Sequence, residues 1–171
     1  IDSFAYMPVQ DFGNAFSTFI AQNYGARETG RIRSGLKSAV CISMAFCLVV
    51  SALVFIFARP LMTIFVEAGE TEIIQAGVQY LRIEGAFYCG IGCLFLLYGL
   101  YRGIGKPFMS LVLTVISLGT RVGLAYLLAP IPAIGLPGIW WAIPIGWFLA
   151  DATGLLYYRF SSSRPSFMRR K

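Results

Sequence analysis

The chain has 171 residues, of which 57% are hydrophobic and only 13% are charged, and its net charge is +6. A soluble globular domain carries about 25% charged residues, so this composition indicates a protein whose solvent is the lipid bilayer. The positive charge alone would allow a nucleic-acid partner, but its distribution along the chain, described below, follows membrane topology and excludes that class.

The clearest element is the uncharged run at residues 38–58, which is rich in Ala, Val, Ile, Leu, Phe and Cys. At about 1.5 Å per residue, a helix of this length crosses the ~30 Å hydrocarbon core of a bilayer. Four other segments follow the same pattern less strictly. The sequence thus predicts five transmembrane helices, at residues 4–23, 38–58, 84–101, 107–128 and 139–158. The expected fold is an all-α polytopic membrane helix bundle that forms a single membrane domain over residues 1–171.

The first predicted helix has a polar side. At 100° per residue, one arc contains Gln10, Asp11, Asn14, Ser17, Thr18 and Gln22. Phe12, Phe16, Phe19 and Ile20 lie opposite, so we expect the phenylalanines to face lipid and the polar arc to line a transport pathway. A carboxylate in hydrocarbon is costly, which makes Asp11 a candidate site residue. The alternative is that Asp11 lies at the wetted outer interface.

The longest connection, residues 59–81, combines an apolar run with an amphipathic segment. It predicts an interfacial turn followed by a lead-in to the third membrane helix. That third helix carries the candidate pathway residues Tyr88 and Phe95, with glycines at 85, 92 and 99 that favour close helix packing.

Charged residues recur near the outer ends of the third and fourth helices. Helix rise places Glu84 and Arg121 at similar depth, so we expect them to form a charge network, most simply a structural ion pair. The alternatives are that Arg121 extends to the outer headgroups or takes part directly in transport. Asp151 in the last helix lies nearer the cytoplasm, where Arg102 or Lys106 is its expected partner.

The cysteines at 41, 47, 89 and 93 all lie inside hydrophobic spans, and the chain has no histidine. A thiolate metal site would need ionised sulfur in hydrocarbon, so packing is the simpler interpretation. We therefore expect no metal site, no cofactor other than a coupling ion, and no enzymatic activity.

Basic residues are concentrated in alternate connections, which contain eleven of the fourteen Lys and Arg. They lie at Arg27, Arg31, Arg33 and Lys37, at Arg102 and Lys106, and in the tail at Arg159, Arg164, Arg169, Arg170 and Lys171. The positive-inside rule places these connections and the C-terminus in the cytoplasm of a plasma membrane. The first helix then starts outside, so we expect at least one earlier helix to precede it.

Three segments carry a resemblance to a known family. Residues 16–27 read FSTFIAQNYGAR, residues 101–107 read YRGIGKP and residues 136–142 read LPGIWWA. In this spacing the chain resembles the multidrug and toxic compound extrusion (MATE) family. The resemblance implies two six-helix lobes, of which this chain would supply helices eight to twelve, with the seventh helix and the N-terminal lobe absent.

The resemblance implies exchange of Na⁺ or H⁺ for organic cations by alternating access. In one subfamily an acidic residue of the tenth helix contributes to the cation site, and Glu84 lies on the corresponding helix. The expected function is thus cation-coupled multidrug efflux. A lipid-linked precursor flippase of the same superfamily would need more cations than a lone Arg121, and a non-transporting membrane subunit would not need the polar faces.

Overall fold

The computed structural model describes residues 1–67, 69–131 and 135–160, so the basic tail beyond residue 160 lies outside the described residues. Within them the chain is all α-helical, as the composition predicts. The helices are α1 (Asp2–Gly25), α2 (Thr29–Thr63), α3 (Thr71–Gly85), α4 (Tyr88–Gly103), α5 (Pro107–Leu128) and α6 (Gly135–Phe160).

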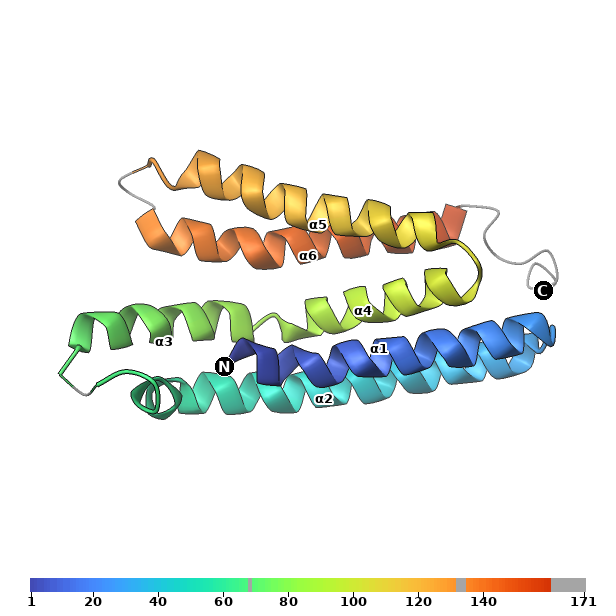
Figure 1. Cartoon of the computed structure of the whole chain (residues 1–171), viewed down its shortest axis with the longest axis horizontal. Coiled ribbons are helices and arrows are strands. Elements are labelled where there is room, and N and C mark those ends of the chain that lie inside the picture. Colours follow the sequence, from blue (N-terminus) through green and yellow to red (C-terminus); the bar gives the residue numbers. More distant parts are fainter. Residues whose placement is uncertain (68, 132–134, 161–171) are drawn as a thin grey trace.

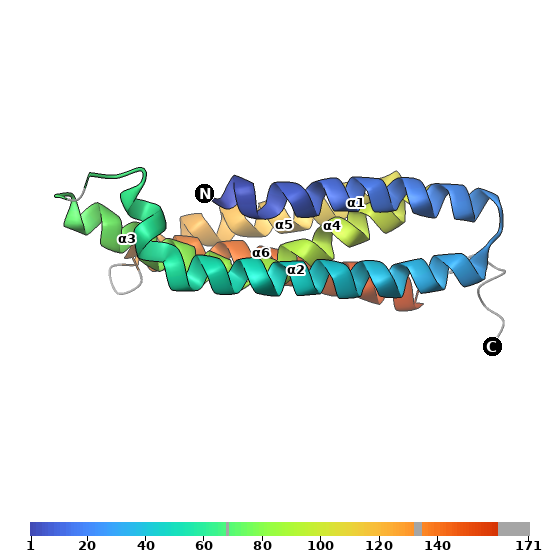
Figure 2. The same ribbon diagram turned by 90° about the horizontal axis from the view of Figure 1, so that it is seen from below.

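The helices run roughly parallel to one long axis (Figures 1 and 2). The successive elements α3 and α4 lie between the α1–α2 hairpin and the α5–α6 hairpin (Figure 1). The α1–α2 and α4–α5 connections and the end of α6 lie at one end of the bundle, and the α2–α3 and α5–α6 connections lie at the other (Figure 1). The basic connections of the described chain are therefore grouped at a single end.

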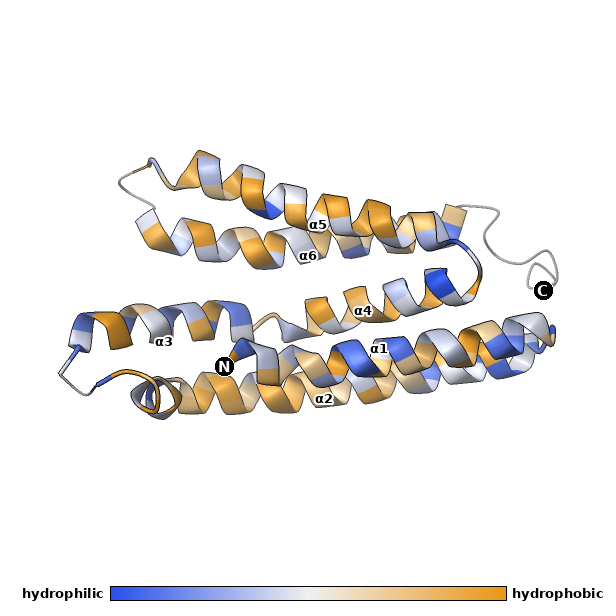
Figure 3. Ribbon diagram, in the orientation of Figure 1, coloured by the Kyte–Doolittle hydropathy of each residue, from blue (hydrophilic) through white to orange (hydrophobic). Residues whose placement is uncertain are grey.

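Length and hydropathy alone qualify three helices of the described residues to cross a membrane, namely α2, α5 and α6. The bent pair α3 and α4 would be a fourth span. Helix α1 does not meet this criterion because polar residues occupy one of its sides, which Figure 3 shows in blue. It nevertheless lies alongside α2 and α4 over most of its length (Figures 1 and 2).

The expected helix at 84–101 is divided in the structure. Helix α3 ends at Gly85, α4 begins at Tyr88, and the two axes are bent by 50°. Phe87 leaves the helical region at φ −115° and ψ 17°, so the regular hydrogen-bond ladder is interrupted there. The amphipathic lead-in is thus a helix of its own that extends into the predicted span.

Helix α2 runs past the predicted end of its span, to Thr63, and it is kinked. Phe57 has non-helical angles (φ −96°, ψ 15°), and Pro60 follows inside the helix. Proline has no backbone N–H, and its ring clashes with the carbonyl one turn earlier, which bends a helix at this position. The last turn of α2 is thereby placed opposite α3.

Helices α1 and α4 pack through glycine. A Cβ at Gly99 would lie 2.5 Å from the carbonyl oxygen of Gly13, and one at Gly103 would lie 2.7 Å from Ile20. The prediction that α4 glycines allow close helix approach is therefore confirmed. The expectation that the phenylalanines of α1 face lipid is wrong. Phe12 and Phe19 are half-buried and pack against the core, and Phe16 is buried at 5% exposure. It packs into the space that the missing side chain of Gly99 leaves open.

Helix α6 packs against both α5 and α4. A Cβ at Gly146 would lie 2.6 Å from the Ser117 carbonyl of α5, and the Tyr101 hydroxyl of α4 donates to the Gly154 carbonyl at 2.6 Å. Many large apolar side chains of α2, α5 and α6 are exposed, as a lipid environment requires, and Figure 3 colours much of these helices as hydrophobic. The molecule is therefore an all-α membrane helix bundle.

Candidate functional site

A carboxylate from α1 lies where α3 bends into α4. The Tyr80 hydroxyl donates to Asp2 Oδ2 at 2.7 Å, and the Tyr88 hydroxyl donates to Asp2 Oδ1 at 2.7 Å. The two tyrosines stand on opposite sides of the bend, in α3 and α4 respectively. Asp2 therefore ties the first turn of α1 to both halves of the bent pair.

A second carboxylate lies in the same cluster. Glu84 is only 3% exposed, and its Oε2 has no hydrogen-bond partner among the described residues. Its carboxylate interacts with Tyr80 and with Asp2. An unpaired buried oxygen costs about 1–3 kcal/mol, and two ionised carboxylates in a desolvated site also repel. The arrangement favours the binding of a proton or a small cation between them.

The cluster draws its residues from three helices: Asp2 of α1, Tyr80 and Glu84 of α3, and Tyr88 of α4. Tyr80 and Glu84 are four residues apart on one side of α3, and Tyr88, four residues further, follows the bend at the start of α4. Trp140 of α6 packs edge-on against the Tyr80 ring at 6.1 Å between centroids. We call Asp2, Tyr80, Glu84 and Tyr88 the carboxylate cluster.

The direct ion pair expected between Glu84 and Arg121 is not among the contacts of the described residues. Arg121 acts on Glu84 only as a nearby positive charge, while Glu84 interacts with Tyr80 and Asp2. The side chain of Arg121 instead runs along α6, where a Cβ at Gly146 would lie 2.9 Å from its Cγ. Arg121 is close enough to influence Glu84, but its side chain is not directed at it.

A polar groove of about 230 Å³ lies between α1, α4 and α5. Its lining comprises Gln10, Asn14, Phe95, Tyr98, Arg102, Ser110, Leu111 and Thr114. The Arg102 guanidinium donates to Asn14 Oδ1 at 3.0 Å and to the Tyr98 carbonyl at 3.2 Å, which ties α4 to α1. Phe95 and Tyr98 stack edge to face at 6.0 Å and present an aromatic wall.

The predicted pathway residues thus divide. Gln10, Asn14 and Phe95 meet in the polar groove, whereas Tyr88 belongs to the carboxylate cluster. Asp11, Ser17 and Thr18 lie on α1 outside the groove lining. Asp11 and Thr18 are exposed on the surface of α1, and Ser17 is half-buried.

Asp151 has a different environment from the one expected. It is 7% exposed, its Oδ1 has no hydrogen-bond partner among the described residues, and its carboxylate contacts the Cys93 thiol. Arg102 donates to α1 instead, and the Lys106 ammonium lies over the Tyr157 ring at 5.5 Å. The expected pair of Asp151 with either cation is therefore wrong, because its side chain points across to α4.

Asp2 and Tyr80 are the site residues that the sequence did not reveal. Asp2 lies before the helix predicted at residues 4–23, and nothing in its local sequence indicates a site residue. A usable signal was the four-residue spacing of Tyr80, Glu84 and Tyr88, which continues one polar side across the bend.

Known proteins share this architecture. The chain has a TM-score of 0.83 with the inward-facing conformation of a multidrug resistance MATE family transporter, at 24% identity and 95% coverage of this chain. A MOP superfamily transporter from Pyrococcus furiosus gives a TM-score of 0.87 at 24% identity and 100% coverage. In both cases this chain covers 38% of the solved chain.

The chain is also similar in sequence to curated multidrug resistance proteins. The chain is 27% identical over 165 residues to the probable multidrug resistance protein YpnP of Bacillus subtilis, covering 94% of this chain and 35% of the relative. It is 24% identical over 141 residues to the probable multidrug resistance protein NorM of Thermotoga maritima, covering 82% of this chain and 30% of the relative. The chain spans about a third of the length of these curated relatives. The family model MatE matches residues 1–127, and the chain therefore belongs to the MatE family.

Proposed function

We propose that this chain forms most of the C-terminal lobe of a multi-pass efflux antiporter, which exchanges Na⁺ or H⁺ for organic cations by alternating access. Membership of the MatE family and the names of the relatives support a transporter rather than an enzyme. The coverage of about a third of each relative supports a single lobe, with an N-terminal lobe and a preceding helix as its partners. These names give no support to a flippase for lipid-linked precursors.

The observation that carries the proposal is the carboxylate cluster. Glu84 is buried with one unpaired oxygen, and Asp2 accepts hydrogen bonds from two tyrosines beside it. Carboxylate and hydroxyl oxygens are ligands that Na⁺ accepts, and a carboxylate pair equally holds a single proton. In this proposal the cluster is the coupling-ion site.

The polar groove serves the substrate in this proposal. The aromatic wall of Phe95 and Tyr98 suits a planar organic cation, and Gln10 and Asn14 supply polar contacts. Arg102 is the charged residue of the described lining and would repel a cationic centre. The substrate therefore places its charge toward the carboxylates of Asp2, Glu84 or the exposed Asp11, and its apolar part in the groove.

Coupling then follows from competition. The coupling ion and the substrate cation each neutralise the same carboxylates, so binding of one weakens binding of the other. Either ligand moves the transporter between its two orientations only by its difference in affinity for them. In our proposal the basic connections and the C-terminus face the cytoplasm. The two described connections that contain Arg27, Arg31, Arg33, Lys37, Arg102 and Lys106 lie at one end of the bundle, and the sequence of the tail is also basic.

Substitution of Glu84 tests this function in the intact transporter. The Glu84→Gln and Asp2→Asn variants are reconstituted in liposomes, and efflux of ethidium driven by a Na⁺ or H⁺ gradient is measured. Each variant is expected to lose gradient-driven efflux to near background while keeping its thermal unfolding midpoint. Glu72→Gln, which makes the same charge change at an exposed position of α3, is the matched control and should transport normally. Wild-type efflux in both cluster variants would refute the proposed coupling site.

A further inference from the structure

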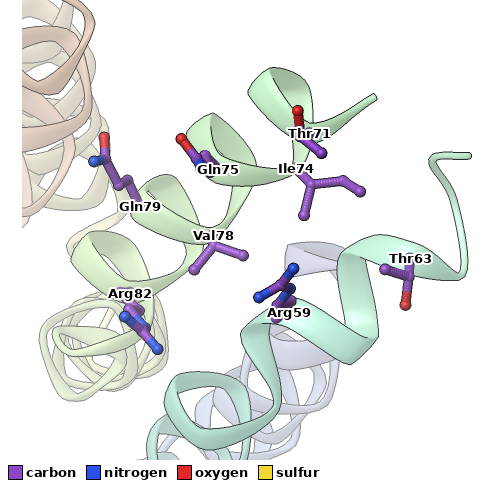
Figure 4. Close-up of a pocket in the computed structure, with 8 residues that line it drawn as sticks. All are labelled: Arg59, Thr63, Thr71, Ile74, Gln75, Val78, Gln79 and Arg82. Carbon is purple, nitrogen blue, oxygen red and sulfur yellow. The ribbon is translucent and has the colours of Figure 1, made fainter. Parts of the chain in front are cut away.

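A second cavity lies at the end of the bundle opposite the basic connections, between the last turn of α2 and α3 (Figures 1 and 4). Its volume is about 450 Å³, far more than the roughly 10–15 Å³ that a single water requires. Its lining comprises Arg59, Thr63, Thr71, Ile74, Gln75, Val78, Gln79 and Arg82. We call it the arginine groove.

The kink of α2 forms one wall of the groove. The kink at Phe57 and Pro60 turns the end of α2, and Arg59 extends from that turn toward α3 (Figure 4). Gln75, Gln79 and Arg82 of α3 also line the cavity, at three- and four-residue spacing, and Figure 4 shows the two glutamines pointing away from Arg59. Val78 and Ile74 supply apolar lining between these polar groups (Figure 4).

The charged residues of the groove lining are both basic, although Glu70 and Glu72 flank the lining residue Thr71 in the sequence. Both charged lining residues are arginines, and none of the described lining residues is acidic. Arg82 is held over the Phe55 ring, 5.4 Å from its centroid, which fixes its side chain while leaving its N–H donors available. The glutamines and threonines add further donors. A guanidinium pair with amide and hydroxyl neighbours matches the several acceptor oxygens of a phosphate group.

The surroundings of the groove are apolar and exposed. Phe55, Ile56 and Phe57 on α2 have 48%, 67% and 49% of their surface exposed, and Ile64 and Phe65 beyond the kink have 72% and 66%. Such side chains on a membrane bundle contact acyl chains. The arginine groove is therefore positioned where the apolar surface ends and a lipid headgroup would lie.

We propose that the arginine groove binds a phosphate group, which in the membrane is that of an anionic phospholipid. Arg59 and Arg82 hold the phosphate oxygens from opposite helices, and the acyl chains lie against the α2 surface. A bound lipid would thus join the kinked end of α2 to α3 at the side of the bundle opposite the basic connections.

Binding of phosphatidylglycerol to the intact, detergent-solubilised transporter is measured by native mass spectrometry, with phosphatidylcholine as the neutral comparison. The Arg59→Gln/Arg82→Gln variant is expected to weaken phosphatidylglycerol binding roughly tenfold or more, since each basic residue near an anionic surface contributes about fivefold. The matched control is Arg31→Gln/Lys37→Gln, which removes two exposed charges from the opposite end of α2. This control should not change the affinity of the most tightly bound phosphatidylglycerol. Gln75→Trp, which fills the groove and keeps both arginines, should also weaken binding.

Inorganic phosphate distinguishes the source of the ligand. If millimolar phosphate raises the thermal unfolding midpoint of the wild type but not of Arg59→Gln/Arg82→Gln, the groove also accepts the free anion. Unchanged binding of both probes in that variant would overturn the proposal. So would an equal loss in the Arg31→Gln/Lys37→Gln control, or wild-type binding in Gln75→Trp, because charge alone would then explain the affinity.

Discussion

Alanine at Gly99 tests the close contact between α1 and α4. The new Cβ would lie 2.5 Å from the carbonyl oxygen of Gly13, which belongs to the backbone and cannot rotate away. Because close carbon–oxygen contacts are about 3.3 Å, the two helices must separate there by roughly 0.8 Å. A gap of this size forfeits a quarter to a half of the dispersion energy of the facing atoms.

The expected destabilisation follows from two opposing contributions. Overpacking of a tight interface costs about 1–3 kcal/mol, and the better helix propensity of alanine returns up to about 1 kcal/mol. We therefore expect Gly99→Ala to lower the free energy of unfolding by about 1–2 kcal/mol. The assay is equilibrium unfolding in mixed micelles with increasing dodecyl sulfate, followed by circular dichroism.

Gly119→Ala is the matched control for this prediction. Gly119 lies in the middle of α5, and a Cβ there would meet nothing within 4 Å. This variant gains the same helix propensity without the clash and should be as stable as the wild type or slightly more so. If Gly99→Ala were as stable as Gly119→Ala, the proposed backbone contact between α1 and α4 would be refuted.

Three further outcomes are expected. Cysteine placed at the exposed Ser34 in a cysteine-free background should react with reagents added from the cytoplasm, and labelling by an impermeant external reagent would contradict the proposed orientation. Asn14→Leu removes the acceptor of Arg102 in the polar groove and should reduce efflux at near-normal membrane abundance; equal losses of both would make the groove merely structural. In double-mutant cycles of unfolding free energy, Asp2→Asn should couple to Glu84→Gln by more than about 0.5 kcal/mol, whereas Arg121→Gln should be additive with Glu84→Gln within about that margin. Strong coupling of Glu84→Gln to Arg121→Gln, with additivity between Glu84→Gln and Asp2→Asn, would instead support a direct Glu84–Arg121 pair.

Hydropathy alone predicted the all-α membrane bundle because long apolar runs have few other stable structures in lipid. Helix α5 begins and ends at the predicted residues, since Pro107 marks a helix start after the tight turn at Gly105. The bend between α3 and α4 was not predictable, because neither Ala86 nor Phe87 is a helix breaker. Its position depends on packing with other helices.

The sequence also could not predict whether an apolar side chain points toward lipid or toward the protein interior. Phe16 is equally compatible with lipid and with a protein interior, since hydrocarbon tails are as apolar as a protein core. Only the facing Gly99 decides that it is buried. The same limit applies to the carboxylate cluster, because hydrogen bonds between Asp2 and Tyr80 or Tyr88 join residues that are about eighty positions apart in the chain.

The backbone contact of α1 with α4 also restricts how the bundle can rearrange. Gly13 and Gly99 meet backbone to backbone, and Gly103 leaves room for Ile20 and the Ser17 carbonyl, so sliding either helix along its axis would drive a neighbouring side chain into a carbonyl group. The two helices must therefore translate and rotate as a single rigid body. If the bundle changes conformation, the relative movement of helices must therefore occur at other interfaces, where long flexible side chains can adjust.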